Sequence, residues 1–257
     1  MSAPPVEPPG GSVISAACER CEPARTRKPE PPAIWTDFAT AVSLRLAAVG
    51  GLCVGSITNF VHLVRIDHVI YATGDLDAAT ARIEATLGLE AVAGGRHEGL
   101  GTHNRIVPLG GGYLELLAVA DPDEAAGSAF GRALLGRIAQ GGDGLAGWAV
   151  AVDDVGQVAA RLGTSISTIA REGMSAQLTG LAEALREPFL PFFIGREPGV
   201  ADPGAAGDAG GITWIEVSGN LVRLERWLGA AQLPVRIVDG TPAVRAVGIG
   251  EAELRTR

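Results

Sequence analysis

Two strongly apolar runs of this chain each carry an ionisable side chain near their centre, and these runs constrain the fold most. His68 lies in the run RIDHVIY, which starts at Arg65, and Glu115 lies in the run GYLELLAV, which starts at Gly112. Short apolar runs of this kind predict buried strands. An imidazole or a carboxylate inside such a strand is costly unless it is paired or bound to another group. We therefore expect both side chains to be paired or to bind a ligand.

The spacing of this pair repeats later in the chain, where the polar residues are missing. His68 and Glu115 are 47 residues apart, and Trp148 is followed after the same interval by Gly195. The runs around Trp148 and Gly195 resemble those around His68 and Glu115. The second copy is displaced by about 80 residues, and such self-similarity predicts a duplicated module. We expect the polar pair in the first copy only.

Both copies show the same order of predicted elements. In the first copy, Asp75 or Asp77 begins a helix that Gly88 closes, and in the second a helix follows Asp154. Strands are predicted in the first copy at 66–72, 89–92, 104–109 and 113–119, and in the second at 147–152, 167–171, 174–178 and 190–194.

The predicted fold class is α+β, with paired βαβββ modules and an extra C-terminal βαββ element. The expected parts of the chain are a first module at 64–120, a connector at 121–146 with a helix at 129–140, a degenerate second module at 147–200 and the βαββ unit at 211–257.

Residues 1–63 differ from the rest of the chain. Half of the 16 prolines precede residue 37, which predicts a disordered leader, or a start assigned upstream of the true one. The stretch 46–64 is about long enough to cross a bilayer, but its three glycines, Asn59 and His62 disfavour insertion. All the cysteines precede the first predicted strand, so none braces the core: Cys18, Cys21 and Cys53.

The charge balance narrows the partners. The formal net charge is −8 at pH 7, which disfavours nucleic acid and anionic membranes as partners, because no basic stripe offsets it. We expect a cytoplasmic protein that binds a small molecule, and the composition leaves a homodimer open.

The strand with a central His, the Asp-capped helix and the closing strand with Tyr-Leu-Glu-Leu resemble glyoxalase-like domains of the vicinal oxygen chelate superfamily. The stretches that carry the resemblance are RIDHVIYATGDL at 65–76, GTHNRIVPLGGGYLELLAV at 101–119 and LPFFI at 190–194. The resemblance implies curved sheets around a central cavity, with metal ligands on the first and fourth strands of each module. His68 and Glu115 then fall on ligand positions, while Trp148 and Gly195 replace the ligands of the second module.

This resemblance implies two alternative functions. In the first, the protein is an enzyme of the lyase, isomerase or dioxygenase type that acts on a small oxygenated molecule. His68 and Glu115 would then bind a divalent metal such as Zn, Ni, Fe or Mn, and both would be catalytic, with Glu115 available as a general base. In the second, His68 and Glu115 form a metal-free pair, and the cavity binds or sequesters an apolar ligand.

Other side chains are candidates for substrate contact. A hairpin centred on Gly111 would pair His103 with Val119, on the face of Glu115 but roughly 13 Å away, so we place His103 and Asn104 at the cavity mouth. Trp148 and Phe193 would form an apolar wall. Strand alternation points Asp67 away from His68, and His97 is predicted to lie in an exposed loop.

Overall fold

The computed structural model describes residues 64–171 and 174–256. They belong to a single compact unit that spans Thr58–Arg257. The predictions for residues 1–63, including the cysteines and the apolar stretch 46–64, lie outside the described residues. Among the described helices, none is long and apolar enough to span a bilayer.

The elements follow the predicted order, with several additions. The strands are β1 (Arg65–Thr73), β2 (Val92–His97), β3 (Thr102–Pro108), β4 (Tyr113–Val119), β5 (Gly144–Ala151), β6 (Ile166–Arg171), β7 (Met174–Thr179), β8 (Phe192–Arg196), β9 (Ile212–Ser218), β10 (Val235–Val238), β11 (Ala243–Ile249) and β12 (Ala252–Arg255). The helices are α1 (Leu76–Leu87), α2 (Pro122–Gly127), α3 (Ala129–Gly141), α4 (Val155–Leu162), α5 (Leu181–Arg186) and α6 (Leu221–Leu228). The sequence did not predict α2, α5 or β12, and it placed β2 too early.

Helix α1 shows how local sequence signals fix the elements. Asp75 caps the helix, because its side chain accepts a hydrogen bond from the backbone N–H of Ala78. Gly88 ends it in the left-handed conformation, with φ of 69°. Ala79 and Ile83 are buried on one face, as their spacing predicts. The helix therefore packs along the sheet between two well-defined ends.

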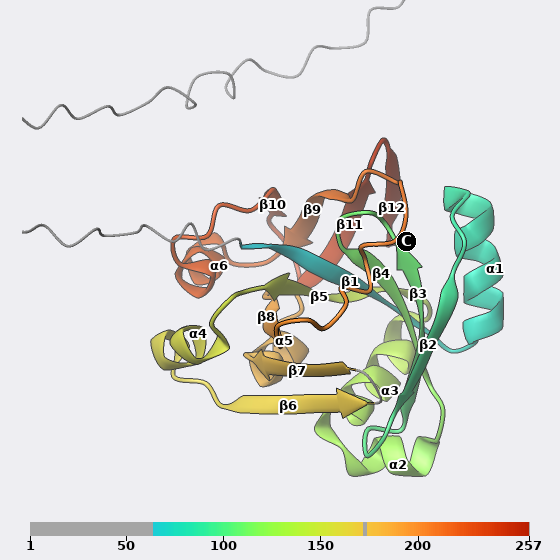
Figure 1. Cartoon of the computed structure of the whole chain (residues 1–257), viewed down its shortest axis with the longest axis horizontal. Helices are drawn as coiled ribbons and strands as arrows, with labels where there is room; N and C mark the ends of the chain where they lie inside the picture. Colours follow the sequence, from blue (N-terminus) through green and yellow to red (C-terminus); the bar gives the residue numbers. More distant parts are fainter. Residues whose placement is uncertain (1–63, 172–173, 257) are drawn as a thin grey trace, which may run out of the picture. The chain divides into compact units, whose positions relative to one another are not determined.

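The central sheet confirms the predicted paired modules. Its strand order is β2-β3-β4-β1-β5-β8-β7-β6, so the first strands of the two modules are neighbours. Strand β1 runs parallel to β4 and antiparallel to β5, and β5 runs parallel to β8. The sheet is strongly curled, and β6 and β7 lie across the direction of β2 (Figure 1).

The two modules correspond at an interval of 79 residues. The helix caps Asp75 and Asp154 are separated by this interval, and so are Asp67 and Ala146, the residues that the β1–β5 register skips on each strand. The interval differs by one from that predicted, and with it His68 corresponds to Gly147 rather than Trp148. This correction shifts every assignment in the second module.

The counterpart of Glu115 follows from the neighbouring strands. Glu115 lies beside Ile70 of β1, the counterpart of Ile70 is Ala149, and Ala149 lies beside Phe192 of β8. Phe192 therefore takes the place of Glu115 in the second module, rather than Gly195. Neither glycine nor phenylalanine has a ligand atom, so the prediction of a degenerate second pair holds with different residues.

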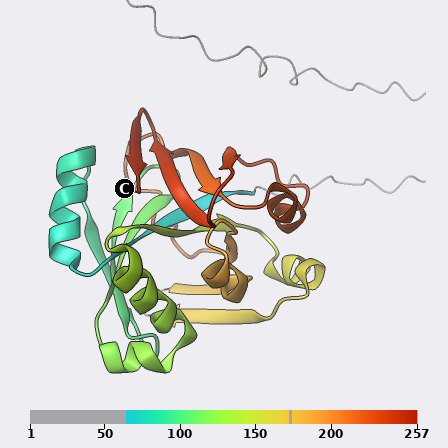
Figure 2. The ribbon, with the colours of Figure 1, turned by 180° about the vertical axis from the view of Figure 1, so that it is seen from behind.

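The C-terminal strands form a second sheet, in the order β10-β9-β11-β12. Strand β9 lies between β10 and β11, so this unit differs in topology from the modules, where the first strand neighbours the fourth. Its buried residues, such as Ile215 and Val217, share one core with Val69 and Trp148 of the central sheet. In both views, this sheet and helices α2 and α3 lie on opposite sides of β1 and β5 (Figures 1 and 2).

Helices α3 and α5 cover the other face of the central sheet. A second core joins Leu134 of α3 and Ala184 of α5 to Ile70, Leu117 and Phe192 of the strands. Both faces of the central strands are therefore buried, one under the C-terminal sheet and one under these helices. The face beneath α3 and α5 also carries His68 and Glu115.

Candidate functional site

The structure brings His68 and Glu115 together on adjacent strands. Nε2 of His68 lies 3.6 Å from Oε2 of Glu115, and the residues are only 3% and 7% exposed. The parallel β1–β4 register puts Glu115 beside Ile70, two residues along from His68 and on the same face. The two side chains share one site, as the sequence indicated.

Asp67 also points toward His68, contrary to the prediction from strand alternation. The β1–β5 register shifts between Ile66 and His68, which leaves Asp67 as an extra residue on β1. Such a bulge redirects the side chain, and Oδ1 of Asp67 lies 2.7 Å from Nδ1 of His68. Asp67 is fully buried, and it orients the His68 ring from behind.

Arg196 of the second module keeps Asp67 ionised. Its Nη1 and Nη2 donate to Oδ2 and Oδ1 of Asp67 at 2.5 and 2.8 Å. Burial alone would raise the pKa of the Asp67 carboxyl, but hydrogen bonds from Arg196 and His68 hold it well below its usual range. Because Asp67 can then only accept, Nδ1 of His68 donates to it, and the lone pair of the neutral ring lies on Nε2, toward Glu115.

Asn104 holds the other oxygen of Glu115. Its Nδ2 donates to Oε1 of Glu115 at 2.5 Å, while its Oδ1 accepts from the backbone N–H of Gly95 at 2.8 Å. The second bond fixes which end of the amide faces the carboxylate. Gly94 is also required here, because a β-carbon at residue 94 would lie 1.9 Å from Oδ1 of Asn104.

His97 belongs to the site, although the sequence placed it in an exposed loop. It is the last residue of β2 and pairs with Thr102 of β3. Its Nδ1 lies 2.9 Å from the Thr102 hydroxyl, and its Nε2 lies 3.9 Å from Oε1 of Glu115. The signal was available in the pairing of β2 with β3, since Thr102 and Asn104 share a face by strand alternation.

These side chains line an enclosed cavity of about 100 Å³. The ring of Tyr113 stacks on His68 with centroids 4.6 Å apart, and that of Phe192 meets it edge-on at 5.4 Å. Burial, followed by the charges of Glu115 and Asp67, raises the pKa of the Tyr113 hydroxyl well above its usual value, so the phenol stays neutral. The cavity thus has polar groups at one end and apolar side chains elsewhere.

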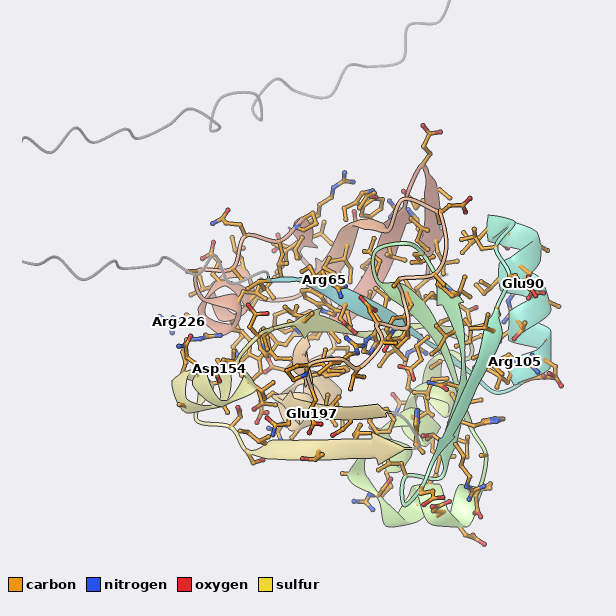
Figure 3. The ribbon with its side chains drawn as sticks, viewed as in Figure 1. Arg65, Glu90, Arg105, Asp154, Glu197 and Arg226 are labelled. Atoms are coloured by element: carbon orange, nitrogen blue, oxygen red, sulfur yellow. The ribbon has the colours of Figure 1, made fainter. Side chains whose placement is uncertain are left out.

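His103 does not line this cavity. The β3–β4 hairpin pairs His103 with Ala118 rather than Val119, and a slip of one residue moves a side chain to the opposite face. His103 therefore lines a separate hollow of about 690 Å³ beside the start of α1. Arg105, two residues further, points the same way and pairs with Asp77 of α1 (Figure 3).

Trp148 and Phe193 also lie away from the cavity, contrary to the prediction. Trp148 is fully buried, pairs with Val69 of β1 and donates from Nε1 to the carbonyl of Phe189 at 3.1 Å. Phe193 packs against Trp227 of α6, with ring centroids 6.2 Å apart. Both side chains belong to the core beneath the C-terminal sheet, and Phe192 forms the cavity wall instead.

The described side chains contain no group of three or more His, Cys, Asp or Glu residues placed to hold a metal ion. The donors that face each other most directly are His68 and Glu115. Glu216, another carboxylate in an apolar strand, pairs with Arg255 of β12 at 3.0 Å. Any ion in the cavity would therefore have protein ligands from the first module only.

Two βαβββ modules joined through their first strands, with polar groups facing a cavity, define a glyoxalase-like fold. The chain belongs to the family of glyoxalase-like domain proteins, whose family model matches residues 66–230. This result confirms the family resemblance seen in the sequence. No curated protein matches the chain.

Solved structures show the same fold. A hypothetical protein from Staphylococcus aureus is 16% identical, with a TM-score of 0.57, over 72% of this chain and 90% of that one. A methylmalonyl-CoA epimerase variant from Streptomyces coelicolor, in complex with 2-nitronate-propionyl-CoA, is 26% identical with a TM-score of 0.41, and the match covers 51% of this chain and 96% of that one. The epimerase from Mycobacterium tuberculosis is 18% identical with a TM-score of 0.40, over 52% and 87%.

Proposed function

We propose that this protein is a glyoxalase-like enzyme that acts on a small oxygenated molecule in the cavity, with a divalent metal such as Zn, Ni, Fe or Mn on His68 and Glu115. The observation that carries the proposal is the 3.6 Å approach of Nε2 of His68 to Oε2 of Glu115, with Nδ1 of the same ring bound to Asp67. A metal-ligating histidine commonly donates its other ring N–H to a carboxylate in this way.

The donor atoms fit a divalent ion. The gap between Nε2 and Oε2 is longer than an N–H···O hydrogen bond, and it suits two donors that each bind one ion at about 2.0–2.2 Å. Imidazole and carboxylate ligands suit Zn, Ni, Fe and Mn. A bound divalent ion would act as a Lewis acid that polarises a substrate oxygen.

The protein's own groups would position the substrate and move a proton. Asn104 holds Oε1 of Glu115 and leaves Oε2 toward His68 and the cavity, where this carboxylate can accept a proton from a carbon acid. Tyr113 and Phe192 enclose the His68 ring and limit its contact with water. The reaction class that fits is proton abstraction next to a substrate oxygen.

The alternative is a binding protein that holds a small molecule without metal. The observation that favours it is the second module, where Gly147 and Phe192 stand at the positions of His68 and Glu115. With two protein ligands, the ion would be weakly retained, and the apolar walls alone would hold a ligand. The alternative uses the same cavity.

Metal content distinguishes the two functions. We would measure Zn, Ni, Fe and Mn by mass spectrometry in the purified protein and in His68→Ala, with His103→Ala as the matched control, because His103 lies on the other sheet face. The enzyme predicts about one ion per chain in the wild type and the control, and almost none in His68→Ala. Equal, near-zero content in all three after metal supplementation would favour the binding protein.

A further inference from the structure

A second, apolar pocket of about 80 Å³ adjoins the cavity. The two hollows have four apolar side chains in common: Ile70, Phe130, Leu181 and Phe192. Because the shared wall carries no charged group, a ligand that leaves the polar end of the cavity meets hydrocarbon on its way to the second pocket.

The loss of the polar pair in the second module creates this pocket. Gly147 and Phe192, the counterparts of His68 and Glu115, both line it. A β-carbon at residue 147 would meet nothing closer than Cδ1 of Ile70 at 3.7 Å, so the missing side chain leaves usable room. The degenerate half of the duplicated fold thus offers an apolar surface where the first half offers ligand atoms.

Two helices close the pocket. Helix α3 contributes Phe130, Ala133, Leu134 and Arg137, whose spacing places them along one helix face. Helix α5 contributes the apolar residues Leu181, Ala184 and Leu185. The guanidinium of Arg137, the one charged group among the pocket-lining residues, donates to the carbonyls of Gly142 and Leu145.

We infer that this pocket binds the apolar end of a ligand whose oxygenated end lies at His68 and Glu115, an inference that rests on the proposed function. A cavity of about 150 Å³ holds benzene and stays free of water, so the smaller pocket fits a chain of three or four carbons. The ligand class is therefore a pair of adjacent oxygens joined to a short, unbranched alkyl chain.

The test compares two hydroxamates that share a head with two adjacent oxygens. Acetohydroxamate carries one methyl group, and hexanohydroxamate carries four further methylenes, so calorimetry of both measures the contribution of the chain. Burial of each methylene should raise the affinity about fourfold until the pocket is full. Gly147→Leu, which fills the pocket, should bring the ratio of the two affinities close to one.

Two further variants keep this test sound if Gly147→Leu folds poorly. Ala133→Leu narrows the same pocket from α3 and should also remove the effect of the chain. Gly136→Leu adds the same side chain to α3 where nothing lies within 4 Å of a β-carbon, and it should keep the wild-type ratio. A wild-type ratio near one, or a ratio unchanged in both pocket variants, would overturn the inference.

A toluene titration followed by methyl NMR separates this inference from the proposed function. Toluene has no oxygen, so saturable shifts that Gly147→Leu and Ala133→Leu abolish would support the pocket even if neither hydroxamate binds, in which case the proposed function fails. Binding of acetohydroxamate without any effect of the chain or of toluene would leave the proposed function standing and refute the pocket.

Discussion

Asp67 and Arg196 form a buried, two-pronged ion pair that joins the modules behind the candidate site. Two N–H groups of Arg196, at the end of β8, bind both carboxylate oxygens of Asp67, on β1. Asp67 in turn holds His68. The second module has thus lost its own polar pair but supplies the cation that orients the histidine of the first.

We predict that Asp67→Asn destabilises the fold by about 3–5 kcal/mol, because it leaves the largely buried Arg196 without its counter-charge. Urea unfolding measures this change. The matched control is Asp202→Asn, which breaks the more exposed pair with Arg65 and should cost at most about 1 kcal/mol. Equal effects of the two substitutions would show that the buried pair adds no stability.

We also predict that this stabilisation depends on pH in a defined direction. The pKa of Asp67 is lower in the folded protein than in the unfolded chain, where it is about 3.9. Its contribution is therefore complete above that value and is lost progressively as the pH falls toward the folded value. The stability difference between wild type and Asp67→Asn should stay constant above about pH 5 and shrink below about pH 4. A difference that grows on acidification would contradict this assignment.

Adjacent residues on β3 should differ sharply in their effect on the site. Asn104→Ala removes the hydrogen bond to Glu115 and should weaken zinc binding by about 10–100-fold, as expected for an outer-shell partner. His103→Ala, on the opposite face, should leave zinc affinity unchanged. Competition with a chromophoric chelator gives both affinities, and a larger loss in His103→Ala would refute the register found here.

Gly94→Ala should disturb the same site from behind. The new methyl group would overlap Oδ1 of Asn104 and lie 2.6 Å from its backbone oxygen, so overpacking should cost about 1–3 kcal/mol. Gly127→Ala, in α2, adds a methyl where nothing lies within 4 Å and should be neutral or slightly stabilising. Thermal unfolding compares the two variants, and a neutral Gly94→Ala would mean that Asn104 is not held in place by β2.

The sequence alone determined the polar pair and most of the elements. His68 and Glu115 interrupt apolar runs, and the caps Asp75 and Asp154 mark equivalent helices. These signals are local, since they depend on hydrophobic pattern and capping chemistry within a few residues. The family resemblance then added the arrangement of the modules, which the observed sheet order confirms.

Only the tertiary structure decided which side chains join that pair. The sheet that carries the site is covered on both faces, so its strands are apolar throughout, and alternation cannot reveal that Phe192 faces the cavity while Trp148 and Phe193 face the C-terminal sheet. A hairpin register one residue away from that predicted exchanged His103 for Asn104. The bulge that turns Asp67 toward His68 depends on pairing with β5. Such choices are made by contacts between distant segments, and these contacts leave no periodic mark in the sequence.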